Sequence, residues 1–138
     1  MNTVSWMNEI ETIERILEIK TIAVVGISDK QERPSFFVAK YLLSRGYEII
    51  PVNPNFSEWE GMKCFPDLKS IDKPVDVVDI FRKPEAVGEI VAEAIKIGAK
   101  AVWLQEGVIN EQAAEMAEKN SLLVVMDRCM KKECEKRA

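Results

Sequence analysis

The chain has 138 residues, of which 47% are hydrophobic and 30% are charged, and its formal net charge at pH 7 is −4. This length suits one domain with a real core, and the composition argues against disorder. A negative net charge argues against a dedicated nucleic-acid binder, which must neutralise many phosphates. No segment reaches the roughly 18 apolar residues of a membrane helix. The first residues carry acids and no apolar signal segment, so we expect a cytoplasmic protein without membrane attachment.

The residue types that most often carry catalysis or bind metals are scarce. The chain has no histidine, which excludes Ser–His–Asp and Cys–His chemistry within it. Its three cysteines, Cys64, Cys129 and Cys134, show no metal-ligand spacing. We therefore expect no metal site, and nothing marks a catalytic residue. The sequence leaves open whether any of the cysteines forms a disulfide.

Hydrophobic spacing predicts helices and strands in alternation along the chain. Trp6, Ile10, Ile13 and Leu17 recur at helical spacing and predict an N-terminal helix that packs on the domain. The strands are predicted over 22–27, 47–52, 75–81, 101–104 and 122–126, and the helices over 35–45, 84–97 and 111–119.

The ends and buried faces of these helices can also be predicted. Gly46 and Gly98 are expected to end the second and third helices, and Asn110 to cap the fourth. The second helix should bury Phe37, Val38, Tyr41 and Leu42, and the third Val87, Ile90, Val91, Ala94 and Ile95. Residues 56–73 read as irregular with a short helix and a turn at Gly61, and the charged end of the chain as a helical turn or a frayed tail.

Five β-rich segments separated by helices predict an α/β fold: a single-domain, Rossmann-like, doubly wound sheet of about five parallel strands with helices on both faces. The N-terminal helix falls within residues 1–20, the domain covers 21–130, and a charged tail covers 131–138. In such a sheet, ligands bind beyond the carboxyl ends of the strands. The segments at those ends are therefore the candidate site.

The turn after the first strand favours a phosphate site. Gly26 permits a tight turn and close approach of a ligand to the backbone, and Ile27 and Ser28 follow it. Pro34 suits the start of a helix whose positive end faces the same spot. Arg33, just before it, is either a bidentate phosphate clamp or a surface arginine. The turn lacks the second and third glycines of a dinucleotide site, and Asn53 stands where a ribose-binding carboxylate is expected, so both features count against NAD.

The other strand ends supply further candidates, each with a plainer interpretation beside it. Asn53 and Pro54 form either a simple turn or a wall of the pocket. Phe81, with Arg82 and Lys83, can hold an adenine face and attract phosphate, or Phe81 can be core and the cations solvated.

The fourth and fifth strands end in a second group of candidates. Gln105 and the backbone around Gly107 and Val108 are candidates for ligand contact, whereas Trp103 is more often core. Cys129 is read as a structural or surface thiol, with a mixed disulfide to a thiol ligand as the less favoured reading.

Several sequence blocks then match one family in order. They are VVGIS at 24–28, RPS at 33–35, GYEIIPVNPN at 46–55, G-MK at 61–63, PVDVVDIFRKPE at 74–85, GAKAVWLQEGV at 98–108 and VVMDRC at 124–129. With these blocks the chain resembles the small stand-alone CoA-binding proteins, whose domain is related to the CoA-binding Rossmann-like domain of the succinyl-CoA ligase alpha subunit. Family members typically have Ala where Ile27 stands here. The catalytic histidine of the ligase lies in a separate domain, so the resemblance does not imply ligase activity.

The resemblance implies binding of coenzyme A or an acyl-CoA at the strand ends, without catalysis, with the pantetheine arm leading toward Gln105 or Cys129. The candidate contacts are Gly26, Ile27, Ser28, Arg33, Pro34, Asn53, Pro54, Phe81, Arg82, Lys83, Val87, Gln105, Gly107 and Val108. Two other functions stay open. One is an enzyme that uses NAD(P) or a CoA thioester, with Asp79 or Asp127 as base, and the other is a subunit whose partner chain supplies catalysis. A homodimer is also open.

Overall fold

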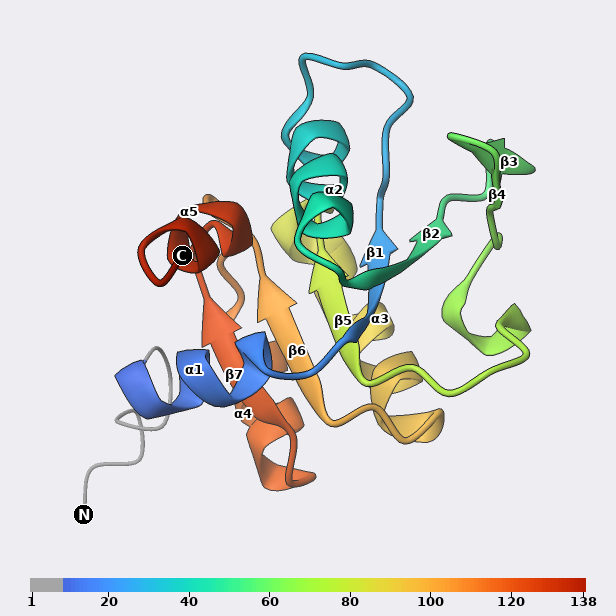
Figure 1. Ribbon diagram of the computed structural model, residues 1–138. Coiled ribbons are helices and arrows are strands. Elements are labelled where there is room, and N and C mark those ends of the chain that lie inside the picture. Colours follow the sequence, from blue (N-terminus) through green and yellow to red (C-terminus); the bar gives the residue numbers. More distant parts are fainter. Residues whose placement is uncertain (1–8) are drawn as a thin grey trace.

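The structure is a computed structural model that describes residues 9–138, so Trp6 and the start of the expected N-terminal helix lie outside the described residues. Five strands form one parallel sheet in the order β2-β1-β5-β6-β7 (Figure 1). Their bounds are Thr21–Val25 (β1), Glu48–Val52 (β2), Val77–Ile80 (β5), Ala101–Leu104 (β6) and Leu123–Met126 (β7). The predicted single α/β domain with a five-stranded parallel sheet is confirmed. The order of the strands reverses between β1 and β5, and this places a crevice at their carboxyl ends.

Helices cover both faces of the sheet. The bounds are Ile10–Leu17 (α1), Pro34–Ser44 (α2), Val87–Lys96 (α3), Glu111–Lys119 (α4) and Met130–Glu135 (α5), with 3₁₀ turns at Leu68–Ser70 (η2) and Pro84–Ala86 (η3). Side chains of α3 and α4 share one hydrophobic core with alternate strand residues, and those of α1, α2 and α5 share the other. The strands are therefore buried on both sides, as their nearly continuous apolar runs indicate. No helix of the described residues is long and apolar enough to cross a membrane.

Two predicted helix faces need correction. Ile10, expected to be buried, is 67% exposed, and α1 buries Ile13, Ile16 and Leu17 instead. In α2 the expected Phe37 is 41% exposed, whereas its neighbour Phe36 is 7% exposed and belongs to the core. Eight of the eleven positions of α2 are apolar, so periodicity alone could not choose between adjacent phenylalanines. The packing of Phe36 edge-on against the Trp59 ring, 5.4 Å between centroids, decides it.

The stretch expected to be irregular contains a small hairpin. Strands β3 (Glu58–Trp59) and β4 (Met62–Lys63) pair antiparallel around a turn in which Glu60 and Gly61 both have positive φ. This is the backbone that a two-residue hairpin requires. The hairpin buries Trp59, which is 2% exposed, against α2 and the loop after β1.

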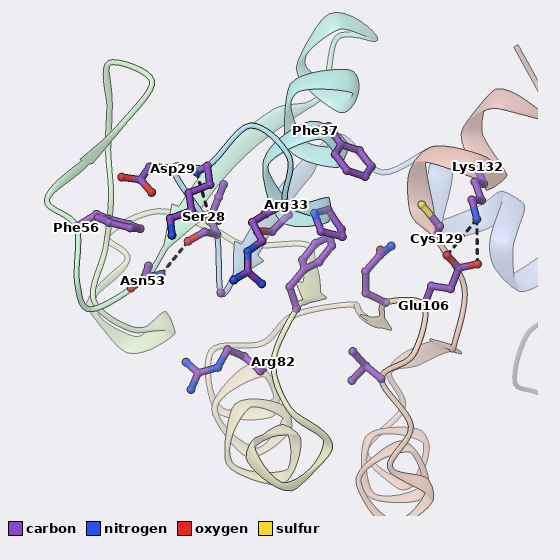
Figure 2. A pocket seen from close by; sticks show the side chains of 18 residues that line it. Ser28, Asp29, Arg33, Phe37, Asn53, Phe56, Arg82, Glu106, Cys129 and Lys132 are labelled. Carbon is purple, nitrogen blue, oxygen red and sulfur yellow. Dashed lines mark hydrogen bonds and ion pairs between the residues drawn. The ribbon is translucent and has the colours of Figure 1, made fainter.

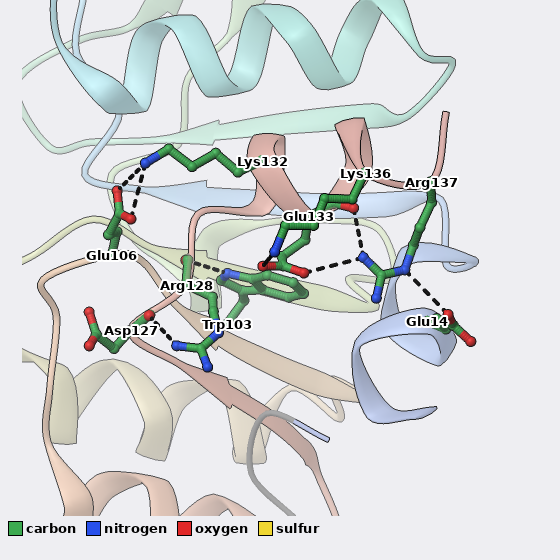
Figure 3. Close-up of polar contacts among 9 residues, drawn as sticks. All are labelled: Glu14, Trp103, Glu106, Asp127, Arg128, Lys132, Glu133, Lys136 and Arg137. Carbon is green, nitrogen blue, oxygen red and sulfur yellow. Dashed lines mark hydrogen bonds and ion pairs between the residues drawn. The ribbon is translucent and has the colours of Figure 1, made fainter. Parts of the chain in front are cut away.

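The charged end of the chain forms a packed helix rather than a frayed tail. In α5, Met130 is fully buried and Glu133 is 6% exposed. Arg137 Nη1 lies 3.2 Å from Glu133 Oε1, and Arg137 Nε lies 3.4 Å from Glu14 Oε2 on α1 (Figure 3). On the sheet side, the Trp103 indole donates a 2.8 Å hydrogen bond to the Arg128 carbonyl just before the helix. These contacts hold α5 beside the carboxyl ends of β6 and β7.

Candidate functional site

A cavity of about 590 Å³ opens at the carboxyl ends of β1, β5 and β6, between the first turn of α2 and the start of α5 (Figure 2). This volume is typical of a small-molecule or cofactor site. Ten of the fourteen predicted contact residues line it: Gly26, Ile27, Ser28, Arg33, Pro34, Asn53, Phe81, Arg82, Gln105 and Val108. The structure thus brings together residues that span more than half of the sequence.

The other four predicted residues do not line this cavity. Pro54 lines a second cavity of about 300 Å³ on the α3 side, which Gly26 and Arg82 also line. Val87 is fully buried in the core and presents no surface to a ligand. Lys83 is exposed ahead of η3, and the exposed Gly107 donates its N–H to Asp127 Oδ1 at 2.8 Å. Their roles in binding stay predictions.

Gly26 lets the loops after β1 and β5 approach each other. Its φ is +89°, a conformation that side chains with a Cβ rarely adopt. A Cβ on this residue would lie 2.4 Å from the Phe81 carbonyl oxygen and 2.9 Å from Arg82 Cδ. The glycine is therefore required both for the turn and for the narrow separation between the two loops.

Two side chains fix the loop that follows Gly26. Asn53 Nδ2 donates to the Ile27 carbonyl at 2.7 Å, and Trp59 Nε1 donates to the Ser28 carbonyl at 2.7 Å. These bonds satisfy successive carbonyl groups of the loop and hold its conformation. Asn53 thus lines the cavity but also positions the loop, a role that the sequence did not reveal.

Several hydrogen-bond donors that line the cavity have no partner among the described residues. They are the backbone N–H groups of Ser28 and Asp29, and both the N–H and the hydroxyl of Ser35 in the first turn of α2. The first N–H groups of a helix lack intrahelical partners and carry partial positive charge. Together these groups form a site with the donors that bind phosphate.

The charges around the cavity favour an anionic ligand although the whole chain is negative. Its lining carries the cations Lys30, Arg33, Arg82 and Lys132 and the carboxylates Asp29 and Glu106. Lys132 pairs with Glu106, at 3.1 Å. Lys30, Arg33 and Arg82 have no acidic partner within residues 9–138. Three uncompensated cations beside free N–H groups can bind more than one phosphate group.

Aromatic side chains supply apolar surface to the same cavity. Phe81 is half-buried and packs against the core beneath α2, while Phe37 and Phe56 line the cavity from α2 and from the loop after β2. Figure 2 shows Phe56 on the side of Asn53 and Phe37 on the side of Cys129, with Arg33 between them. Aromatic rings next to arginines suit a planar base attached to phosphates.

Sequence reasoning missed part of the lining: Asp29, Lys30, Ser35, Phe37, Phe56, Glu106 and Lys132. Most of these adjoin predicted residues, so a wider window around each strand end would have found them. Lys132 is different because it lies in the segment expected to be a tail. Only the packing of α5 brings it to the cavity.

The two carboxylates considered as catalytic bases are placed elsewhere. Asp79 lies inside β5, beside Val24 and Trp103, and is fully buried with both carboxyl oxygens unpaired. Burial raises the pKa of Asp79 well above its ordinary value, which favours the neutral carboxyl. Asp127, whose Oδ1 accepts from Gly107, is not part of the cavity lining either. Neither group is positioned to take a proton from a ligand in the cavity.

A doubly wound sheet with a phosphate-type cavity at its switch point defines a small Rossmann-like ligand-binding domain. A family model described as a CoA binding domain matches residues 20–135. The chain belongs to this family of CoA-binding domains, and the family predicted from the sequence is confirmed.

Relatives of two kinds are similar to this chain. The uncharacterized protein YneT of Bacillus subtilis is 42% identical over 120 residues, which cover 86% of this chain and 89% of YneT. A hypothetical protein from Pyrococcus horikoshii has a solved structure that matches with a TM-score of 0.91 at 42% identity, covering 99% of this chain and 96% of that one. The ADP-forming acetate–CoA ligase II of Archaeoglobus fulgidus is 31% identical over 101 residues, 72% of this chain but only 15% of the ligase. The same domain therefore occurs both by itself and inside larger enzymes.

Proposed function

We propose that this chain binds coenzyme A or an acyl-CoA, without catalysing a reaction on it, in the cavity at the strand ends. The observation that carries the proposal is the group of three unpaired cations, Lys30, Arg33 and Arg82, beside unpaired N–H groups at the start of α2. Coenzyme A carries a diphosphate and a further phosphate on its ribose, so its adenosine end matches this charge. The family to which the chain belongs supports the same ligand.

The two sides of the cavity suit the two ends of such a ligand. Phosphates would bind to the Ser28–Asp29 loop, Arg33 and Arg82, and the adenine would pack on Phe81 or Phe56. The pantetheine arm would then extend toward Cys129, which lies on the side away from Asn53 in Figure 2, and toward Gln105, which bonds to the residue after Cys129. Neither Asp79 nor Asp127, the two carboxylates considered as bases, lines the cavity, so the geometry gives no support to catalysis by either of them.

A second candidate function is a CoA-binding subunit that works with a catalytic partner chain. The similarity to a short part of the Archaeoglobus fulgidus ligase favours it, because there the matching region is joined to further domains in one chain. Purification of the native protein from its own cells, followed by mass spectrometry, tests this candidate. A stoichiometric second polypeptide supports the subunit role, and a chain that purifies alone contradicts it.

Thermal unfolding in the presence of separate ligands tests the main proposal. CoA and acetyl-CoA are expected to raise the Tm, because a ligand that binds only the folded state stabilises it by about 2.7 kcal/mol at a hundredfold excess over Kd. NAD, NADP and ATP at the same concentration are the controls, and we expect smaller shifts. A shift with NAD and none with CoA would overturn the proposal.

Removing either central arginine should weaken the binding of CoA. Arg33→Ala and Arg82→Ala are each expected to cost about 1.5–3 kcal/mol, roughly 10- to 150-fold in Kd, if the contact to phosphate is charge-assisted. Isothermal titration calorimetry measures the change. Arg45→Ala, at the opposite end of α2 from Arg33, removes an exposed arginine outside the cavity and should leave Kd unchanged. Unchanged affinity in either test variant removes that arginine from the site.

A further inference from the structure

Cys129 is the cysteine of this chain whose side chain faces the cavity. It follows β7, is 7% exposed, and lines the cavity as a free thiol (Figure 2). The other two cysteines are also free but lie elsewhere. Cys64 donates to the Asn53 carbonyl from within the core, and Cys134 lines a separate cavity beside Tyr47. A thiol group that enters the main cavity can therefore meet only one cysteine there.

Gln105 next to Cys129 has an unused hydrogen-bond donor. Its side chain is 3% exposed, and its Oε1 accepts from the backbone N–H of Met130, the residue after Cys129, at 3.3 Å. Its Nε2 has no partner among residues 9–138, although Gln105 lines the cavity. This nitrogen is not among the fully buried unpaired side-chain atoms of the described residues, so it is accessible from the cavity. It can donate to an acceptor supplied by the ligand, such as a carbonyl of a pantetheine amide, on the side of the cavity that Cys129 lines.

A cation stands on the same side of the cavity. Lys132, one turn after Cys129, binds both Glu106 oxygens at 3.1 Å. The hydrogen bond and charge of Glu106 raise the pKa of Lys132, and Cys129 adds a smaller contribution in the same direction. Lys132 therefore keeps its positive charge on the side of the cavity that Cys129 also lines.

We propose that Cys129 takes up coenzyme A as a reversible mixed disulfide. The inference rests on the proposed binding of CoA and adds a redox role to the same site. The oxidant is a disulfide of coenzyme A. The Cys129 thiolate attacks one sulfur of that disulfide, a bond forms between Sγ and the pantetheine sulfur, and the S–S bond of the disulfide breaks. The second CoA leaves as a thiolate and takes a proton, so one disulfide is exchanged for another. A small thiol reverses the step by the same exchange.

Intact-mass spectrometry tests the proposal on the full chain after incubation with oxidised coenzyme A dimer. We expect the mass to rise by one CoA unit, dithiothreitol to remove the addition, and peptide mapping of the unmodified sequence to place it on Cys129. Cys129→Ser should abolish the adduct, and the matched control Cys134→Ser should retain it. Because mapping uses the natural chain, it gives a result even if a substitution of Cys129 disturbs folding. An adduct only on Cys64 or Cys134 overturns the proposal.

A comparison with oxidised glutathione shows whether binding of CoA in the cavity promotes the reaction of Cys129 or whether the thiol reacts with any disulfide. Oxidised glutathione lacks the phosphorylated adenosine, so we expect it to react with Cys129 at least about tenfold more slowly at equal concentration, because it is not held beside the sulfur. Equal rates overturn the proposal. Calorimetry with reduced CoA distinguishes failure of the mixed-disulfide proposal from failure of the proposed CoA binding. Binding of reduced CoA without adduct formation contradicts only the mixed disulfide, whereas no binding at all contradicts the proposed function.

Discussion

Gly26→Ala is expected to lower the free energy of unfolding by about 2–4 kcal/mol, since it combines left-handed backbone strain with a steric clash. The residue has a φ of +89°, and the new Cβ would lie 2.4 Å from the Phe81 carbonyl oxygen. That oxygen belongs to the backbone and cannot rotate away, so the loops after β1 and β5 must separate. The same movement would displace Arg82, so binding of CoA should be lost or strongly weakened. Urea unfolding and calorimetry measure the two effects.

Gly98→Ala is the matched control for this prediction. Gly98 has a similar φ of +79° after α3, and a Cβ there would meet nothing within 4 Å. Gly98→Ala should lower the free energy of unfolding only through the strain of a left-handed backbone, by about 1–2 kcal/mol. Binding of CoA should not change. If both alanine variants lost the same free energy of unfolding, the clash with the Phe81 carbonyl oxygen would not contribute to the effect of Gly26→Ala.

Asp79→Val is expected to stabilise the protein at neutral pH by about 1–3 kcal/mol, because it replaces an unpaired buried carboxyl with an apolar side chain of similar size. Asp79 is fully buried, and neither of its carboxyl oxygens has a partner within the described residues. Its neighbours across the sheet, Val24 and Trp103, are apolar and fully buried. Chemical denaturation at pH 7 gives the difference directly.

The difference in free energy of unfolding between Asp79→Val and the natural chain should depend on pH, and this dependence tests whether the Asp79 carboxyl causes it. Burial raises the folded-state pKa of Asp79 above the unfolded value of about 3.9. Below the unfolded pKa the Asp79 carboxyl is protonated in both the folded and the unfolded state, so the natural chain there has its highest stability relative to the variant. As the pH rises from there toward the folded-state pKa, the natural chain loses about 1.4 kcal/mol per pH unit relative to the variant.

The advantage of Asp79→Val should thus grow with pH above 4. The control is Asp72→Asn, which removes an exposed carboxylate near the start of the same strand. If the difference in free energy of unfolding between Asp79→Val and the natural chain did not change from pH 4 to pH 8, the buried carboxyl would not be its cause.

Much of the fold could be predicted because it depends on local patterns. The five strands are buried on both faces and are therefore nearly continuous apolar runs. Asn110 caps α4 as predicted, with its side chain accepting from the Ala113 N–H at 3.0 Å. Gly46 and Gly98 end their helices with positive φ. The short hairpin at Glu58–Lys63 escaped prediction because strands of two residues leave no measurable period.

The candidate site was predictable in its location and less so in its contacts. Parallel strands place their carboxyl ends together, so the segments after the strands had to converge. Which atoms of those segments remain free for a ligand depends on bonds between distant residues. Asn53 and Trp59 bond successive carbonyl groups of the loop after β1 from another part of the chain. The sequence around Asn53 or Trp59 contains no local pattern that predicts these hydrogen bonds.

The sequence by itself determined the class of fold, the edge of the sheet where a ligand can bind, and the membership in a family of CoA-binding domains. These follow from periodicity, special backbone residues and ordered motifs, all of which are local in the chain. Only the tertiary structure decided that Phe36 rather than Phe37 is core, that the charged end packs as α5, and that Cys129, Gln105 and Lys132 meet at one side of the cavity. The physical reason is that packing and burial are set by neighbours far away in sequence, which a local pattern does not contain.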